Sequence, residues 1–149
     1  MGEHVVVRQN YQFETEILAA DPHTPESDQL ESVAHVFQLT PYGMLLAGLG
    51  ACTAVVLNTY AEYHGVGLEQ VELRLTYDRV FDDDCETCLE VEQYRESISE
   101  EIVLIGDLSP DERRKLLAIS KQCPIHKMLR DGIPVKSLLA GEGVEPKDE

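Results

Sequence analysis

The sequence predicts a mixed domain of helices and strands organised around one long central helix, and three observations support this prediction. Residues 41–61 carry no charge although the chain as a whole is strongly charged, and Thr40 before them is a favourable helix N-cap. Residues 71–78 alternate between apolar and polar side chains, as in a strand with one buried face. Residues 109–112 (Ser-Pro-Asp-Glu) have the spacing of a capping box with proline at the first helical position, which predicts a second helix.

The central helix is expected to run from Thr40 to His64, where a glycine-containing stop signal follows. At 1.5 Å per residue such a helix spans about 36 Å, whereas a globule of this length has a radius of gyration of about 15 Å. Its apolar side chains fall on all sides, so we expect it to be buried nearly all round. One small domain cannot cover such a helix by itself, and we therefore expect a dimer.

The same run is long enough to cross a membrane, which takes about 20 apolar residues. Glycine, threonine and asparagine residues dilute it, however, and no basic residues flank it closely. We therefore expect no membrane association. The small residues Gly48, Gly50 and Ala51 are instead expected to let another backbone approach the helix closely.

The composition fits one domain. The chain has 149 residues, 43% of them hydrophobic, which is enough for one domain with a core. We assign residues 1–140 to this domain and residues 141–149 to an acidic tail that we expect to be disordered. The formal net charge of −16 makes nucleic acid and anionic lipid unfavourable partners. The sequence shows no signal pattern near its start, and we expect a cytoplasmic protein.

The other elements have weaker signals in the sequence. Asn10 is expected at a hairpin turn, and residues 21–29, rich in Pro, Asp and Ser, are expected in a surface loop. A change of apolar phase within residues 89–105 predicts a strand with a β-bulge near Gln93. Further strands are expected over residues 5–7, 11–19, 33–39 and 133–139, and further helices over residues 110–122 and 124–129.

The chain has four cysteines, Cys52, Cys85, Cys88 and Cys123, which in a cytoplasmic protein favour catalytic, redox or metal-binding roles over a structural disulfide framework. Cys123 precedes Pro124, which places its thiol at the N-cap of a short helix, where free N–H groups and the helix dipole favour a thiolate. Cys52 lies in the middle of the central helix between small residues. For both residues the alternative is a cysteine that only fills space in the core.

Four stretches together resemble the OsmC/Ohr family, the osmotically induced and organic hydroperoxide resistance proteins. They are PYGMLLAGLGACTAVVL, the strand opening GVGLEQVELRL, the run GDLSPDERRKLLAIS, and CPIHKML. In this order they cover most of the chain from residue 41 to about residue 139. The resemblance implies an α+β architecture, the OsmC-like fold, in which antiparallel sheets pack around a long central helix. It also implies an intertwined homodimer with two sites at the subunit interface.

The resemblance further implies a thiol peroxidase. In the peroxidase members the cysteine that matches Cys52 attacks the hydroperoxide, and the cysteine that matches Cys123 resolves the product. A thiolate cleaves the O–O bond to give a sulfenic acid, and a second thiol condenses with it to form a disulfide. The expected partners are an organic hydroperoxide or hydrogen peroxide and a dithiol reductant, with no cofactor required.

Tyr42 departs from the pattern of the organic hydroperoxide branch, which has a glutamate directly after the helix-starting proline. In that branch the glutamate orients an arginine that stabilises the attacking thiolate. Arg8, in the N-terminal strands, is the candidate arginine here, and the Tyr42 hydroxyl is a second candidate for stabilising Cys52. The departure leaves an alternative function open: a non-catalytic protein of the same fold that binds a small apolar ligand or a metal.

Cys85 and Cys88 form a C-x-x-C motif within DDDCETC, at the expected tip between two long strands. The motif fits half a zinc site, a redox pair or a local disulfide. The neighbouring carboxylates should make both thiols poor nucleophiles, whereas a bound cation would reverse that penalty. Zinc or iron at this loop is therefore the candidate metal site, with an idle loop as the alternative. His126 could lie near Cys123, because both belong to the CPIH turn.

Overall fold

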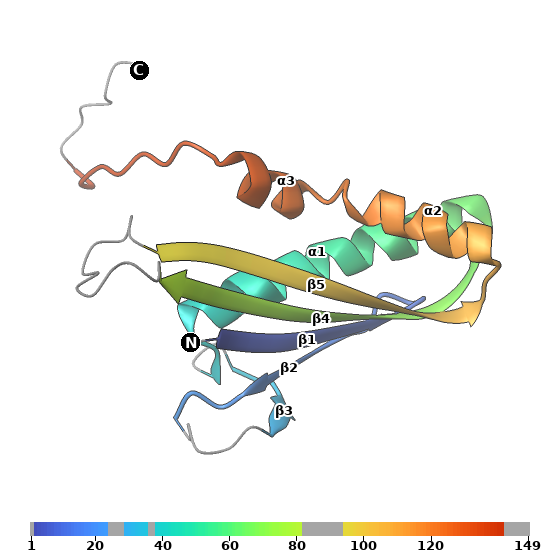
Figure 1. The fold of residues 1–149 in the computed structure, drawn as a ribbon, viewed down its shortest axis with the longest axis horizontal. Helices are drawn as coiled ribbons and strands as arrows, with labels where there is room; N and C mark the ends of the chain where they lie inside the picture. The colour runs from blue at the N-terminus through green and yellow to red at the C-terminus, as the bar shows by residue number, and fades with distance from the viewer. Residues whose placement is uncertain (1, 24–28, 36–37, 82–93, 142–149) are drawn as a thin grey trace.

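The computed structural model describes residues 2–23, 29–35, 38–81 and 94–141. Within these ranges three strands precede the long helix α1, and two long strands and two shorter helices follow it (Figure 1). The elements are β1 (Gly2–Asn10), β2 (Thr15–Ala20), β3 (Leu30–Ser32), α1 (Pro41–His64), β4 (Gly67–Phe81), β5 (Tyr94–Asp107), α2 (Pro110–Ser120) and α3 (Pro124–Asp131).

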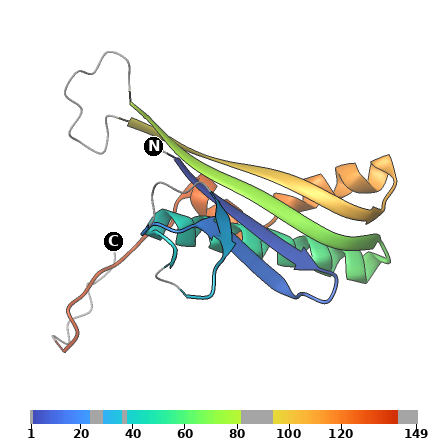
Figure 2. The ribbon, with the colours of Figure 1, turned by 90° about the horizontal axis from the view of Figure 1, so that it is seen from below.

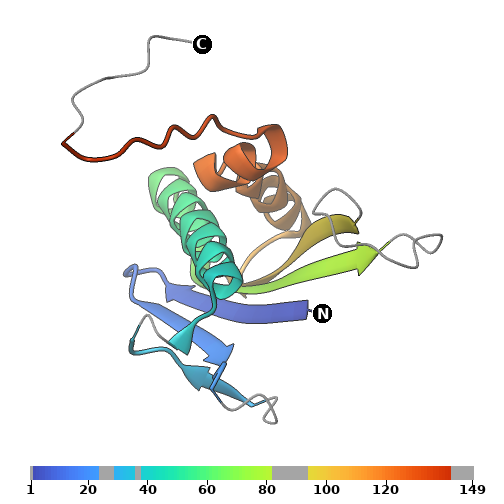
Figure 3. The ribbon, with the colours of Figure 1, turned by 90° about the vertical axis from the view of Figure 1, so that its left-hand side faces the viewer.

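The strands form one antiparallel sheet in the order β3-β2-β1-β4-β5. All three helices lie on the same side of this sheet (Figure 3). α1 packs on β1 and β4, and α2 and α3 pack on α1. β4 and β5 continue as a two-stranded ribbon past the end of β1 (Figure 2). The predicted α+β fold, with antiparallel strands packed on a long helix, is confirmed, although the described strands form one sheet rather than several.

Alternation along the strands gives the sheet one apolar face and one charged face. Val5 and Val7 of β1 pair with Leu75 and Leu73 of β4, and all four side chains are fully buried beneath α1. The intervening residues point the other way, as the exposed side chain of Arg8 shows. The alternation of apolar and polar residues that predicted β4 therefore also produces the apolar face on which α1 packs.

The helices begin where the sequence predicts. The Thr40 hydroxyl accepts a hydrogen bond from the Gly43 amide at 3.0 Å, and Gly65 ends α1 in the left-handed conformation, with φ of 64°, that glycine adopts without strain. At the start of α2, the Ser109 hydroxyl accepts from the Glu112 amide at 3.1 Å, while the Glu112 carboxylate accepts from the Ser109 amide at 2.9 Å. Both predicted caps, including the capping box, are confirmed.

Within the single chain, α1 is not buried all round as we predicted. Its sheet-facing side is buried, but an exposed stripe runs along the opposite side, with Met44, Leu45 and Val55 each 41–45% exposed and with Gly48 and Thr59 also on the surface. Between Met44 and Thr59 this exposed stripe of α1 has no charged residue, which is unusual for a helix that faces water; Glu62 continues it near the end of the helix. By length and composition α1 could cross a membrane, and half of its apolar window is buried inside the chain, but the core helix of a globular domain has the same properties.

The first hairpin differs from the prediction. Residues 11–14 were expected in the second strand but lie in the turn between β1 and β2. The Asn10 side-chain oxygen accepts hydrogen bonds from the Gln12 and Glu14 amides, both at 3.0 Å, and these amides are then not available to a strand ladder. Asn10 itself, placed at the turn by its residue type, closes β1 as expected.

The strand predicted over residues 33–39 is also wrong, because the strand before α1 is the shorter β3, paired with β2. The Gln38 side-chain oxygen accepts from the amides of Ala34 and His35, each at 2.8 Å. These local hydrogen bonds replace the strand pairing that the apolar residues suggested.

Residues 133–139 do not form the predicted closing strand. They pair with no strand of the described chain and run away from the sheet after α3 (Figure 1). Ile133 and Val135 are 58% and 81% exposed, so the described part of the chain leaves their apolar side chains largely uncovered. On α2, Leu117 is also half exposed, while Leu116 is buried.

Four predictions lie wholly or largely outside the described residues: the surface loop over residues 21–29, the β-bulge near Gln93, the C-x-x-C residues Cys85 and Cys88, and the acidic tail over residues 141–149. The two long strands that flank the C-x-x-C segment are present, and their last pair is Phe81 with Tyr94. The assignment of residues 1–140 to a single domain stays a prediction.

Candidate functional site

The structure brings Cys52 and Cys123 together. Cys52 lies in the middle of α1 and is half-buried, whereas Cys123 is the N-cap of α3 and is fully buried. Both thiols are free, and a hydrogen-bonding contact joins them. Residues far apart in the sequence thus meet because α3 packs across α1.

The first amides of α3 reach both sulfur atoms. Pro124 occupies the first helical position and has no N–H, and the next two amides are free because a helix leaves its first N–H groups without partners. The His126 amide donates to Cys123 Sγ at 3.4 Å, as the CPIH turn suggested, and the Ile125 amide donates to Cys52. The positive end of the helix dipole therefore faces the sulfur pair, where it would stabilise a negative charge.

Cys52 is nevertheless held as a neutral thiol in the single chain. Burial is the largest of the effects that raise its pKa, and the hydrogen bond with Cys123 adds to it. The Ile125 amide lowers the pKa, while negative charge on Cys123 and on Glu100 of β5 raises it. Cys52 thus needs a further stabilising group or a proton acceptor to form the thiolate that attacks a peroxide.

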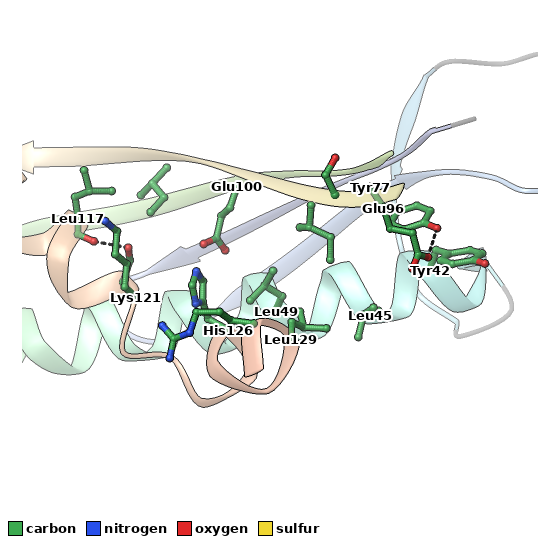
Figure 4. Close-up of a pocket in the computed structure, with 15 residues that line it drawn as sticks. Tyr42, Leu45, Leu49, Tyr77, Glu96, Glu100, Leu117, Lys121, His126 and Leu129 are labelled. Atoms are coloured by element: carbon green, nitrogen blue, oxygen red, sulfur yellow. Dashed lines mark hydrogen bonds between the residues drawn. The ribbon is translucent and has the colours of Figure 1, made fainter. Parts of the chain in front are cut away.

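A cavity of about 590 Å³ lies near the thiol pair, bounded by the first half of α1, the strands β4 and β5, and the helices α2 and α3, although neither cysteine lines it (Figure 4). Leu49, which lines it, lies one turn before Cys52 on the same side of α1, and His126 lines it three residues after Cys123. Its walls are apolar side chains with a few polar groups between them. The lining residues are Tyr42, Leu45, Leu49, Tyr77, Glu96, Ser97, Ile98, Glu100, Ile102, Leu117, Ser120, Lys121, His126, Leu129 and Arg130.

Tyr42 does hold an arginine, but that arginine is Arg79 of β4. Arg79 Nη2 donates to the Tyr42 hydroxyl at 2.7 Å, and its guanidinium lies 5.4 Å from the centre of the Tyr42 ring. Tyr42 stacks on Tyr77 with 4.6 Å between the ring centres, and the Tyr77 hydroxyl donates to Glu96 at 2.6 Å. The cluster closes the end of the cavity near the start of α1, about ten residues or some 15 Å along the helix from Cys52.

Arg8 does not approach Cys52 within the chain. It lies on the charged face of the sheet, on the side opposite α1, where Arg8 Nε donates to Glu72 at 2.7 Å and Nη1 to Glu16 at 3.3 Å. The hydrogen bond to Glu72 is the main effect that raises the pKa of Arg8. Neither candidate for stabilising the Cys52 thiolate, Tyr42 or Arg8, therefore does so inside one chain.

The sequence reasoning missed Arg79 and Glu100, although a signal for both was present. Arg79 continues the inward phase of β4 from Tyr77, and Glu100 interrupts the inward phase of β5 between Ile98 and Ile102. A charged residue in the apolar phase of a strand points into the core or a cavity. Such a residue is a candidate functional group, because it is costly for the fold unless it has a role.

No group of three or more His, Cys, Asp and Glu side chains in the described ranges is arranged to hold a metal ion. The candidate metal site at Cys85 and Cys88 belongs to residues 82–93, which are outside those ranges. It stays a prediction.

The fold is an antiparallel sheet covered by a long helix that bears one cysteine, and a second cysteine lies at the N-cap of a short helix. The chain is therefore an α+β protein whose candidate site contains two thiols. The sequence profile of the family described as "OsmC-like protein" matches residues 34–137, and the chain belongs to this family. No curated protein sequence matches the chain.

Among solved structures, the chain resembles an OsmC-like hydroperoxide resistance protein from Jannaschia sp. CCS1, with a TM-score of 0.59. The two sequences are 15% identical, and the match covers 95% of each chain. At that identity the likeness shows a shared fold over nearly the full length of both proteins. The family resemblance seen in the sequence is thus confirmed.

Proposed function

We propose that this protein is a thiol-dependent peroxidase that reduces organic hydroperoxides or hydrogen peroxide through Cys52 and Cys123. The observation that supports the proposal most strongly is the contact between the two thiols at the N-terminus of α3, beside a cavity large enough for a small organic molecule. Cys52 is the attacking residue, because its thiol is partly open while Cys123 is fully buried.

The reaction proceeds in three steps. The Cys52 thiolate attacks the terminal oxygen of the hydroperoxide; a sulfur–oxygen bond forms, the O–O bond breaks, and the alkoxide takes a proton and leaves as the alcohol. The Cys123 thiol then attacks the sulfenic acid sulfur, water leaves, and a Cys52–Cys123 disulfide forms. A dithiol reductant returns both residues to thiols by exchange. The cycle needs no bound cofactor.

We also propose that the functional unit is an intertwined homodimer. The exposed stripe of α1 is uncharged from Met44 to Thr59, and its small residue Gly48 would let a second helix approach closely. Ile133 and Val135 in segment 133–139 are largely exposed in the described chain, and a second subunit would bury these apolar side chains. Cys52 borders the exposed stripe, so the partner subunit could supply the group that stabilises its thiolate. A cytoplasmic location suits the free thiols.

The second candidate function is a non-catalytic protein that binds a small apolar ligand. The raised pKa of Cys52 and the apolar walls of the cavity favour it. Peroxide consumption separates the two functions: with dithiothreitol and cumene hydroperoxide, the wild-type protein should turn over many times and Cys52→Ser should not. Turnover that survives in Cys52→Ser, or a wild-type protein that consumes no peroxide, would leave the binding function as the better account.

A further inference from the structure

Glu100 is the most unusual charged residue near the proposed site. It lies on β5 opposite Leu75, in the inward phase between Ile98 and Ile102, and lines the cavity. One of its carboxylate oxygens, Oε2, is buried and has no hydrogen-bond partner. Figure 4 shows the carboxylate pointing from the strand into the cavity, toward the ring of His126.

His126 contributes a second unpaired buried atom on the same cavity, because its Nδ1 also has no hydrogen-bond partner. The other titratable groups that line this space are Tyr42, Tyr77, Glu96, Lys121 and Arg130. Cys52 does not line it, but Glu100 acts on Cys52 electrostatically. Buried polar atoms are nearly always paired, so two unpaired atoms facing one cavity indicate a place where a polar group binds or a proton moves.

The environment favours the protonated form of Glu100. Burial is the larger effect and raises its pKa, while the interaction with the Thr53 hydroxyl lowers it. Thr53 can oppose burial only in part, because its single hydroxyl hydrogen also has the Leu49 carbonyl oxygen as an acceptor at 2.9 Å. A carboxyl group in such surroundings exchanges its proton closer to neutral pH than a surface glutamate does.

Glu100 and Cys52 act on each other. The negative charge of Glu100 raises the pKa of the Cys52 thiol, so ionising both groups at once is unfavourable, and the states that matter for the reaction hold one proton between the two groups. That proton can sit on Cys52, which leaves Glu100 charged, or on Glu100, which leaves Cys52 as the nucleophilic thiolate. The second arrangement is the one that attacks a peroxide.

We propose that Glu100 is the acid–base residue of the peroxidase reaction: it accepts the proton of the Cys52 thiol and donates it to the departing oxygen of the hydroperoxide. This inference rests on the proposed function. The Glu100 carboxylate takes the thiol proton, directly or through one water, and the thiolate attacks the terminal oxygen. The O–O bond breaks, its electron pair goes to the alkoxide, and the alkoxide takes the proton from the Glu100 carboxyl. Cysteine and hydroperoxide become sulfenic acid and alcohol, and Glu100 ends as it began.

Glu100→Gln separates this role from a purely electrostatic one. Glutamine has nearly the same shape but no charge and no exchangeable acid proton, so it removes the charge that raises the pKa of Cys52. Alkylation of Cys52 by iodoacetamide at pH 7, which reports thiolate, should be as fast as in wild type or faster. Oxidation of Cys52 by one equivalent of cumene hydroperoxide should instead slow by at least about tenfold, because a general acid–base is worth roughly 10²–10⁴-fold.

Two further variants control the experiment. Glu101→Gln changes the same charge on the next residue of β5, whose carboxylate lies on the other face of the sheet and pairs with Arg74, and it should leave both rates unchanged. Glu100→Asp retains an acid with a shorter reach and should recover part of the lost oxidation rate. Thermal unfolding of each variant checks that it is folded.

The outcomes are distinct. One result is that Cys52 in Glu100→Gln is oxidised as fast as in wild type, and another is that its rates of oxidation and alkylation change by the same factor. In either case Glu100 acts only through its charge, so the inference is wrong while the peroxidase proposal stands. If wild-type Cys52 is alkylated but never oxidised by the hydroperoxide, the peroxidase proposal fails and the role of Glu100 fails with it.

Discussion

Gly50 determines how closely α1 approaches the sheet, and Gly50→Ala tests whether that approach matters. A Cβ at this position would lie 2.7 Å from Leu75 Cδ1 and 2.7 Å from Val7 Cγ2, closer than packed carbon atoms allow, so α1 or both side chains must shift. Overpacking of this kind costs about 1–3 kcal/mol. Exchanging glycine for alanine inside a helix favours folding by about 1 kcal/mol. The net expectation is a loss of up to about 2 kcal/mol in the free energy of unfolding.

Gly48→Ala is the matched control on the same helix. Within one chain, no atom outside its own helical surroundings lies within 4 Å of a Cβ at Gly48, so under conditions in which the protein is monomeric only the helix preference acts and the variant should gain about 1 kcal/mol. The difference between the two variants then isolates the overpacking cost, about 1–3 kcal/mol. Urea unfolding followed by circular dichroism, at one protein concentration because dimer stability depends on concentration, measures both. A Gly50→Ala protein as stable as Gly48→Ala would refute the close approach of α1 to β1 and β4.

Three further predictions address reactivity, assembly and metal. Because burial raises the pKa of Cys52, its iodoacetamide alkylation should rise about tenfold per pH unit through neutrality; a rate that is already flat between pH 6 and 8 would contradict this. Val55→Glu puts a charge on the exposed stripe of α1 and should convert a dimer into monomers in analytical ultracentrifugation, whereas an unchanged mass would place the interface elsewhere. Protein prepared without chelator should contain zinc or iron that is lost in a Cys85→Ser, Cys88→Ser variant; no metal, with both thiols freely alkylated, would leave an idle loop.

Local signals predicted the helices of this protein well and its irregular segments poorly. Thr40, Ser109 and Cys123 are caps that act within one turn of the chain, so their residue types alone located the starts of α1, α2 and α3. The strand predicted over residues 33–39 failed because the Gln38 side chain, which pattern analysis treats as a polar position, captures two backbone amides. Alternation cannot detect such a competing hydrogen bond.

The candidate site was predictable only in part. The resemblance to the OsmC/Ohr family identified Cys52 and Cys123, because the order of its motifs is typical of proteins in which these two cysteines meet. The spacing of the two cysteines in the sequence does not by itself predict that contact. Arg8 was proposed from its place in the N-terminal strands, yet the register of β1 turns its side chain to the charged face of the sheet. Arg79 and Glu100 were missed because the apolar phase of each predicted strand was not followed to the charged residue that lies in it.

The central claim is that Cys52 and Cys123 form a redox pair, and mass spectrometry after treatment with one equivalent of hydroperoxide tests it most directly. The expected product is a Cys52–Cys123 disulfide that dithiothreitol reverses, since the two thiols already touch in the reduced protein. In Cys123→Ser the same treatment should leave Cys52 as a sulfenic acid that excess peroxide drives to the sulfinic form. An unmodified Cys52 in the wild-type protein, with no disulfide to Cys123, would contradict the claim.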